Sequence, residues 1–339
     1  TEFTAEDHAV WDDLFARPGN KSARNLTAGR SVGVLDRRGT GRYGFFVANY
    51  GRPSRYYELG PDGNLLDLGP ALGLDRTTGG RGVWAGPLLG DRPDLYCANE
   101  HGVNFLFRNA GDGGFVEVAS AFKLADADEH ARGVAALDVL GDGRLGLVVG
   151  NWEGPNRLFA RQVDGTFRDR ATPAMALPGA VRTVIAADFD NDGHEEIFFN
   201  LIGEPNRLFG RRGDVWSLLD PAAASEPEAL GTGAAIADVD GDGVLELLIA
   251  HGESAPQPLS LYKVPGAVNR SWLRVAPKTR FGAPARGARV TLTADGRTQI
   301  RVVDAGSGYL CQMEPVAHFG LGDATHLDSV AVTSEPSSR

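Results

Sequence analysis

The sequence predicts an all-β protein: a β-propeller of about five complete blades and a partial one, followed by a small C-terminal β domain. Three observations predict this fold class. The chain repeats itself about every 50 residues, the repeats have acidic turns between apolar strands, and 45 glycines and 19 prolines suit many short strands joined by tight turns. The 339 residues, 42% of them hydrophobic, are enough to bury one large core or two moderate ones.

The repeat is clearest in four similar strings that each run into an aspartate. These strings are residues 29–36, 131–138, 181–188 and 231–238. The aspartates at positions 138, 188 and 238 are 50 residues apart, and Asp36 lies 102 residues, about two periods, before Asp138. The string that begins at Gly80 fills the gap. Four short strands in a unit of this length are typical of a propeller blade.

The repeat divides the chain into three parts. Trp11 matches the aromatic residue that closes a blade, so residues 1–28 are predicted to be the tail of a partial blade. Residues 29–265 are predicted to form the propeller and residues 266–339 the C-terminal β domain. An open propeller exposes edge strands. We therefore expect either a piece of a larger ring or a gap that the C-terminal region covers.

Two blades contain the pattern D-x-D-x-D-G-x-x-E between their first two strands. We call residues 188–196 the first cation loop and residues 238–246 the second cation loop. Alternating carboxylates in one turn converge on a point, the glycine allows the bend, the seventh residue offers its carbonyl and the ninth closes the shell. Such an oxygen cage suits Ca²⁺ better than Mg²⁺; the alternative is an ordinary acidic turn. The predicted metal ligands are Asp188, Asp190, Asp192, His194, Glu196, Asp238, Asp240, Asp242, Val244 and Glu246.

The other blades have degraded loops. The loop that begins at Asp138 lacks the third and ninth ligands, and the loop that begins at Asp36 has Arg38 at a ligand position. No tight metal is predicted at either loop. Arg38 either pairs with Asp36 in place of a cation or lies solvated at the surface. The blade that begins at Gly80 has no acidic loop in register. Because a blade can thus form without metal, the predicted Ca²⁺ is expected to stabilise the protein and not to act in catalysis.

Composition excludes several classes of function. The net charge is −10 and no basic stripe is visible, which argues against a nucleic-acid partner. No apolar stretch reaches the roughly twenty residues of a membrane helix, so no membrane insertion is expected. The seven histidines form no metal-spaced pair, and no G-x-S-x-G elbow occurs. We therefore predict a protein that is not an enzyme; the alternative is a propeller-fold enzyme or a glycan-binding protein.

Several short features leave alternatives open. Cys97 and Cys311 either form one long-range bridge or remain buried thiols, and His318 is expected to satisfy a hydrogen bond at a strand end. The string Arg212, Gly213, Asp214 is either an integrin contact or a plain hairpin turn. Asparagines in glycosylation sequons would hold surface glycans if the chain is exported; they are Asn20, Asn25 and Asn269.

These motifs together resemble a known family. The acidic loops with their flanking strands resemble FG-GAP (VCBS) repeats, the blades of integrin α-subunit propellers. The last part of the chain resembles the ASPIC/UnbV module in the segments 272–275, 281–282, 285–290, 306–311 and 318–322. Repeats followed by this module resemble the cartilage acidic protein family.

The resemblance carries expectations about function. It implies an extracellular, secreted, Ca²⁺-binding glycoprotein of matrix and brain that acts in cell adhesion or signalling. Its partner would be an extracellular protein receptor or a matrix component, and one form would be a ligand or antagonist of a Nogo-type receptor on axons. The resemblance also implies further blades upstream.

Overall fold

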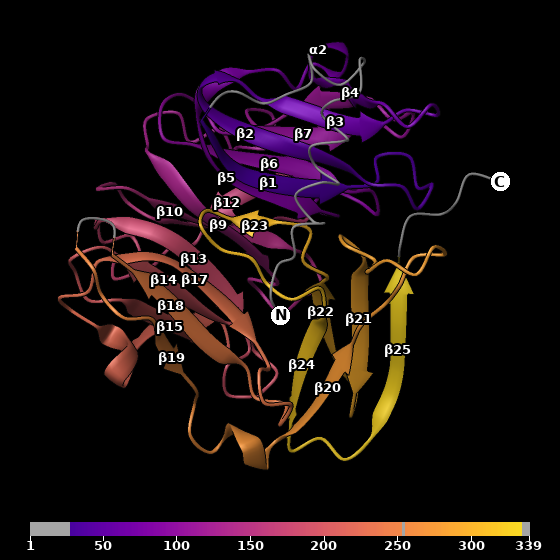
Figure 1. Cartoon of the computed structure of the whole chain (residues 1–339). Coiled ribbons are helices and arrows are strands. Elements are labelled where there is room, and N and C mark those ends of the chain that lie inside the picture. Colours follow the sequence, from indigo (N-terminus) through magenta and orange to yellow (C-terminus); the bar gives the residue numbers. More distant parts are fainter. Residues whose placement is uncertain (1–27, 253–254, 334–339) are drawn as a thin grey trace.

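The computed structural model describes residues 28–252 and 255–333, and these are almost entirely strands and turns (Figure 1). The short helices are α2 (Gly69–Leu72) and the 3₁₀ turns η2 (Ala222–Ser225) and η3 (Ala267–Asn269). The predicted all-β propeller with scarce helix is confirmed.

Four blades are antiparallel units of four strands each. Blade one consists of β1 (Gly29–Leu35), β2 (Gly44–Pro53), β3 (Arg55–Leu59) and β4 (Leu65–Asp67). Blade two consists of β5 (Thr77–Gly86), β6 (Asp94–Asn99), β7 (Phe105–Asn109) and β8 (Phe115–Glu117). Blade three consists of β9 (Ala131–Leu137), β10 (Gly146–Asn151), β11 (Arg157–Arg161) and β12 (Phe167–Asp169). Blade four consists of β13 (Val181–Ala187), β14 (Glu196–Leu201), β15 (Arg207–Arg212) and β16 (Val215–Leu219).

Blade five differs from the prediction, because its sheet has three strands within the described residues. They are β17 (Gly231–Ala237), β18 (Glu246–His251) and β19 (Ser260–Tyr262). After Tyr262 the chain reaches Pro265 and then the 3₁₀ turn η3. Proline has no N–H to donate to a ladder. No hairpin into a fourth strand follows, and the chain passes to the C-terminal domain.

The propeller core lies between neighbouring blades. Apolar side chains of each consecutive pair of blades form a buried cluster. Every residue of β10 and of β14 is buried, because each sheet is covered on both faces. This explains why the second strand of these blades reads as a continuous apolar run and not as an alternating one.

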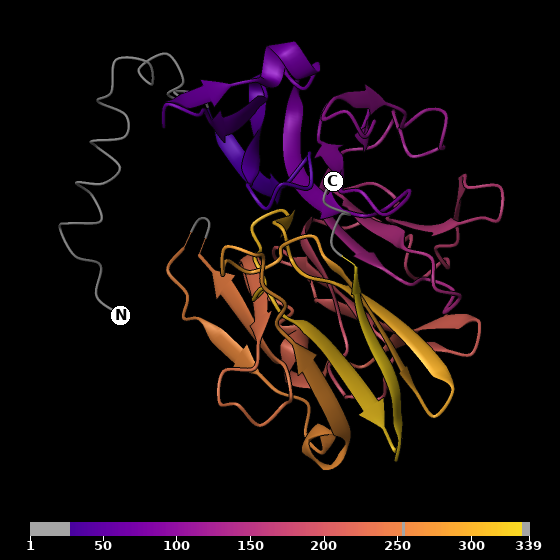
Figure 2. The same ribbon diagram turned by 90° about the vertical axis from the view of Figure 1, so that its right-hand side faces the viewer.

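The C-terminal domain is a small unit of strands (Figure 2) that has its own core. Strand β20 (Ser271–Val275) pairs with β24 (Ala317–Gly322), and β21 (Arg289–Ala294) pairs with both β22 (Arg297–Val302) and β25 (Leu327–Thr333). Buried side chains between these sheets include Val290, Leu292 and Phe319.

One segment of the C-terminal domain enters the centre of the propeller. We call residues 304–311 the axial segment; it includes β23 (Ser307–Gly308), which pairs with β5 (Figure 1). The N–H of Val34 in β1 donates to the carbonyl of Ala305 (2.6 Å), and the N–H of Ala234 in β17 donates to the carbonyl of Leu310 (3.3 Å). The described strands contain no pairing of β17 with β1, so the axial segment is bonded to both ends of the row of blades.

Candidate metal centre

The first cation loop connects β13 to β14 and collects three carboxylates. One oxygen each from Asp188, Asp190 and Glu196 lies within 4.8 Å of the others. Backbone donors shape the turn: the N–H of Gly193 donates to Asp188 Oδ2 (2.9 Å), and Gly193 has φ 88°, which only glycine adopts readily. The local sequence thus aims the carboxylates at one point.

Burial makes these carboxylates costly to ionise without a cation. The pKa of Asp188 is raised to about 6, chiefly by burial, with the neighbouring carboxylates adding to the effect. The pKa of Glu196 is raised to about 9 by burial and by Asp188 and Asp190. Asp188 is 1% exposed, and its Oδ1 has no hydrogen-bond partner among the described residues. A buried carboxylate that has one oxygen without a partner and lies beside two other carboxylates fits a hard divalent cation such as Ca²⁺.

The C-terminal domain contributes to this loop, which the sequence analysis did not predict. The N–H of Gly320 donates to Asp188 Oδ2 (2.9 Å), and His318 Nε2–H donates to Asn191 Oδ1 (2.7 Å). Arg270 pairs with Asp190 (2.8 Å). The expected strand-end hydrogen bond of His318 is thus a contact from β24 to the cation loop.

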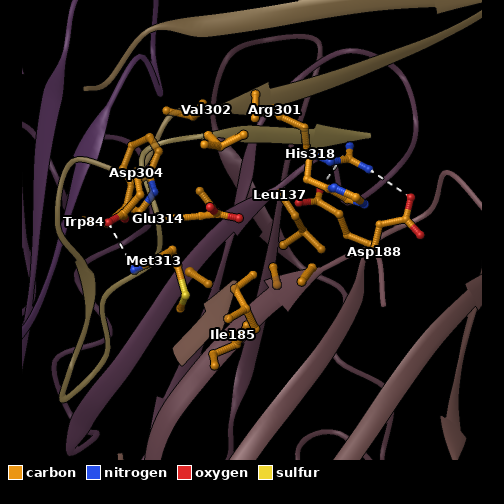
Figure 3. Close-up of a pocket in the computed structure, with 18 of the residues that line it drawn as sticks. Trp84, Leu137, Ile185, Asp188, Arg301, Val302, Asp304, Met313, Glu314 and His318 are labelled. Carbon is orange, nitrogen blue, oxygen red and sulfur yellow. Dashed lines mark hydrogen bonds and ion pairs between the residues drawn. The ribbon is translucent and has the colours of Figure 1, made fainter. Parts of the chain in front are cut away.

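A cavity of about 110 Å³ lies between the inner strands of the propeller and the C-terminal domain (Figure 3). Its apolar wall includes Leu137 and Ile185, and its polar wall includes Asp188, Arg301 and His318. Arg301 lies 3.7 Å from Asp188 Oδ2 and 3.4 Å from Glu195 Oε2. The inner side of the first cation loop therefore borders a partly open cavity with one apolar wall and one polar wall.

The second cation loop connects β17 to β18 and brings together the equivalent three carboxylates. Oxygens of Asp238, Asp240 and Glu246 lie within 4.8 Å of one another. The ammonium of Lys263 lies 2.9 Å from Asp240 Oδ2 and 2.6 Å from Glu246 Oε1. The guanidinium of Arg274 lies 2.9 Å from Asp238 Oδ2. The two loops share their carboxylates but differ in the charges that surround them.

Asp192 and Asp242 are not among these converging side-chain oxygens, and the backbone carbonyls of His194 and Val244 stay predicted ligands. Asp192 Oδ1 accepts the N–H of His194 (2.7 Å), and Asp242 Oδ1 accepts the N–H of Val244 (3.0 Å). The third aspartate of each loop therefore accepts a hydrogen bond from the backbone N–H of the seventh residue. The carbonyl of that seventh residue is the predicted ligand.

The degraded loops are closed by their own backbone. Asp138 accepts hydrogen bonds from the N–H groups of Gly141, Asp142 and Gly143. Asp36 accepts the N–H of Arg38 (3.3 Å), but no ion pair joins these two side chains within the described residues, and Arg38 is exposed. Arg38 therefore lies at the surface, as the second of the two alternatives predicted.

The guanidinium next to Arg38 is the one that the fold buries. Arg37 is 5% exposed and pairs with Glu58 at 2.6 Å. The buried guanidinium of Arg37 thus has a carboxylate partner at a loop where no metal is predicted.

The short features that left alternatives open are now placed. Gly213 and Asp214 form the exposed two-residue turn between β15 and β16. No disulfide joins Cys97 to Cys311, and burial raises the pKa of the Cys97 thiol to about 12. Asn269 is exposed, whereas Asn20 and Asn25 lie outside the described residues.

No helix in the described part of the chain combines the length and the apolar character needed to cross a membrane.

Two family models agree with this architecture. A family model described as FG-GAP-like repeat matches residues 91–149 and 138–199, and a model described as ASPIC and UnbV matches residues 278–333. A solved structure, SapL1 lectin in complex with alpha methyl fucoside, is 13% identical with a TM-score of 0.46, covering 90% of this chain and 95% of that one. A likeness that weak says nothing about what this chain binds.

Two curated relatives are much more similar. Cartilage acidic protein 1 of Xenopus tropicalis is 47% identical over 92% of this chain and 53% of that protein. Cartilage acidic protein 1 of Homo sapiens is 45% identical over 95% of this chain and 53% of that protein. The chain thus spans about half the length of these relatives. With FG-GAP-like repeats followed by an ASPIC and UnbV domain in the same order, this chain belongs to the cartilage acidic protein family.

Proposed function

We propose that this chain acts outside the cell as a secreted, calcium-stabilised binding protein, as a receptor ligand or antagonist or as a matrix component. The relationship to cartilage acidic protein 1 over most of the chain supports this proposal. The name of those relatives describes an acidic protein of cartilage and no reaction. The function is therefore proposed to lie in contacts with other proteins and not in catalysis.

The observation that carries the calcium part is the buried oxygen of Asp188. This oxygen has no hydrogen-bond partner among the described residues, and its carboxylate lies next to those of Asp190 and Glu196. A bound Ca²⁺ would supply positive charge and oxygen coordination at this point. The protein residues around it, Gly320 and His318 of β24, already hold the loop from the side of the C-terminal domain. Ion binding is thus proposed to stabilise blade four together with the C-terminal domain.

Thermal unfolding tests the calcium part. The midpoint of the parent chain is measured in Ca²⁺ and in excess chelator at matched ionic strength, beside the variant Asp190→Ala. Chelation should lower the midpoint of the parent and have little effect on the variant, because a ligand that binds only the folded state stabilises it. An identical midpoint of the parent in both buffers would refute the calcium part.

The partner is proposed to be an extracellular protein receptor. Propeller binding surfaces lie in loops. Surface plasmon resonance on an immobilised ectodomain of the Nogo receptor, with Ca²⁺ present, is the direct measurement. Saturable binding supports a receptor ligand; absence of saturable binding removes this receptor and leaves the matrix component.

The exposed turn at Gly213 and Asp214 offers a separate test of cell adhesion. Cells are allowed to spread on the immobilised parent and on the variant Asp214→Glu, which lengthens the side chain and keeps its charge. Loss of spreading would support an integrin contact through Arg212, Gly213 and Asp214. Equal spreading would show that this turn is structural.

Secretion is proposed to expose Asn269 to glycosylation. The side chain lies at the surface, in the turn before β20. The protein is secreted from animal cells, and the peptide that contains Asn269 is measured by mass spectrometry before and after enzymatic removal of N-linked glycans. This peptide should lose mass on glycan removal. The same peptide of the variant Asn269→Gln should not.

A further inference from the structure

Lys263 places its ammonium inside the second cation loop. The Nζ atom lies 3.0 and 2.9 Å from the two carboxylate oxygens of Asp240, 2.7 Å from Asp242 Oδ1 and 2.6 Å from Glu246 Oε1. Asp240 and Glu246 are two of the three residues whose oxygens converge in this loop. One positive charge therefore contacts three of the four acidic side chains of the pattern.

The strand register shows why only this loop has such a residue. In blade five Leu247 pairs with Tyr262, and in blade four, one period earlier, Ile197 pairs with Phe209. The residue after Tyr262 is Lys263, whereas the residue after Phe209 is Gly210. Blade four thus has no side chain at the position from which Lys263 reaches its loop.

Blade three also has no long side chain at this position. There Leu147 pairs with Phe159, and the next residue is Ala160, which is too short to reach a loop. Among blades three, four and five, only blade five has a long cationic side chain at this position.

The charges around the first cation loop are arranged differently. Arg270 contacts Asp190 from the rim, where both side chains are 39% exposed, and Arg301 lies 3.7 Å from Asp188. No ion pair of the Glu196 side chain occurs among the described residues, and its Oε2 accepts the N–H of Phe189 (3.0 Å). The centre of this loop holds carboxylates and no ammonium.

The second loop still retains the features of a cation site beneath the lysine. The side chain of Asp238 is 1% exposed, and its Oδ1 has no hydrogen-bond partner in the described part of the chain. The side chain of Glu246 is 6% exposed. The oxygens of Asp238, Asp240 and Glu246 converge as those of the first loop do, and within the described residues only in the second loop does an ammonium contact two of the three residues.

We propose that Lys263 is the built-in cation of the second loop, so that this chain binds Ca²⁺ tightly only at the first loop. The inference rests on the proposed Ca²⁺ binding of the first loop for its comparison, but it concerns a different blade. A divalent ion can enter the second loop only by displacing the ammonium from Asp240, Asp242 and Glu246. Removing the lysine charge should therefore open a second site.

Equilibrium binding of Ca²⁺, measured by isothermal titration calorimetry, tests the proposal on the full chain. The parent should bind one ion tightly, and Lys263→Met, which keeps the length of the side chain and removes its charge, should bind two. Lys263→Arg keeps the charge and should still bind one. Lys123→Met, at an exposed lysine in blade two, is the matched control and should also bind one.

A second series assigns the ions to loops. Asp190→Ala should bind none tightly, and Asp190→Ala combined with Lys263→Met should bind one. Two tight ions in the parent, or the same number of tight ions in the parent and in Lys263→Met, would overturn the inference. If the parent binds none and Lys263→Met binds one, the proposal for the first loop fails while the inference on Lys263 stands. If Lys263→Met does not fold, Lys263→Gln is measured in its place and read in the same way.

Discussion

The backbone N–H of Gly320 donates a hydrogen bond to Asp188 Oδ2 over 2.9 Å, although the two residues are 132 positions apart in the chain. Asp188 opens the first cation loop of blade four, and Gly320 lies in β24 of the C-terminal domain. The contact makes the C-terminal domain part of the shell around the proposed metal centre. Calcium binding and domain docking should therefore depend on each other.

Replacing Gly320 by alanine should disturb both. A Cβ at this position would lie 2.4 Å from backbone atoms of Asn191 and 2.4 Å from Asp188 Oδ2. Backbone cannot yield as a flexible side chain can, so β24 or the loop must shift, at a cost of about 1–3 kcal/mol. Gly320→Ala should lower the midpoint of thermal unfolding in Ca²⁺ and weaken Ca²⁺ binding. Gly90→Ala, where a Cβ meets nothing within 4 Å, is the control; equal Ca²⁺ affinity of both variants would contradict the coupling.

The axial segment gives a second prediction. Thr183 Oγ1–H donates to the carbonyl of Tyr309 over 2.7 Å, and Thr183 is fully buried. Thr183→Val keeps the shape of the side chain and leaves that carbonyl without this donor, which costs about 1–3 kcal/mol for a buried group. Chemical denaturation should show this loss, whereas Thr298→Val at the exposed end of β22 should change little. A neutral Thr183→Val would show that the axial segment is not held by blade four.

The blades could be predicted from the sequence because their evidence is local and repeated. Asp138, Asp188 and Asp238 recur at one period, and a turn pattern with alternating carboxylates has one simple geometry. The same locality explains the error in blade five, where the first strands keep the pattern but Pro265 replaces the continuation that a fourth strand needs.

The surroundings of the cation loops could not be predicted, because they come from distant segments. Nothing in the spacing of Gly320, His318 or Arg270 relates them to the first cation loop. Lys263 was hidden for another reason: its role follows from the register of β18 with β19, and the loop before β19 differs in length from its counterpart in blade four. The sequence of the axial segment resembles the ASPIC/UnbV module, but it does not indicate that this segment enters the centre of the propeller.

Asn156 in blade three and Asn206 in blade four lie one period of 50 residues apart and give a third prediction, on stability. Asn156 Oδ1 accepts the N–H of Asn151 (2.9 Å), and its Nδ2 donates to the carbonyls of Met175 and Leu177. The side chain is 1% exposed. Asn156→Ala leaves these backbone groups buried without a partner, so the free energy of unfolding should fall by about 1–3 kcal/mol for each group that water cannot reach.

Blade four provides the matched comparison for this prediction. Asn206 Oδ1 accepts the N–H of Leu201 (2.9 Å), and its Nδ2 donates to the carbonyl of Ala224 (2.9 Å). Asn206→Ala should cost a similar amount in urea denaturation, whereas Asn64→Ala in an exposed turn should cost little. If all three variants lose the same small amount, the repeated asparagine is a feature of sequence and not of stability.

Glu100 links blades two and three and gives the last prediction, a pH dependence. Its carboxylate pairs with Arg81, whose Nε lies 2.6 Å away, and with Arg132, and Glu100 is 7% exposed. Burial acts to raise the pKa of Glu100, but hydrogen bonds from Arg132 and Arg81 outweigh it and hold the pKa below its ordinary value of 4.5. The folded state thus binds this proton less readily than the unfolded state. The stability that Glu100 contributes is present above pH 4.5 and is lost as the pH falls through the folded-state pKa.

Glu100→Gln should therefore destabilise the protein most at neutral pH. The variant leaves two guanidinium groups without their carboxylate, and breaking a buried pair in this way costs about 3–5 kcal/mol. Urea denaturation at a series of pH values should show the difference between parent and variant shrinking as the pH falls below 4.5, because the parent then loses the same charge. Glu228→Gln, at an exposed position, is the control. A difference between parent and Glu100→Gln that stays constant down to acid pH would mean that the packing of the side chain, and not its charge between Arg81 and Arg132, joins the two blades.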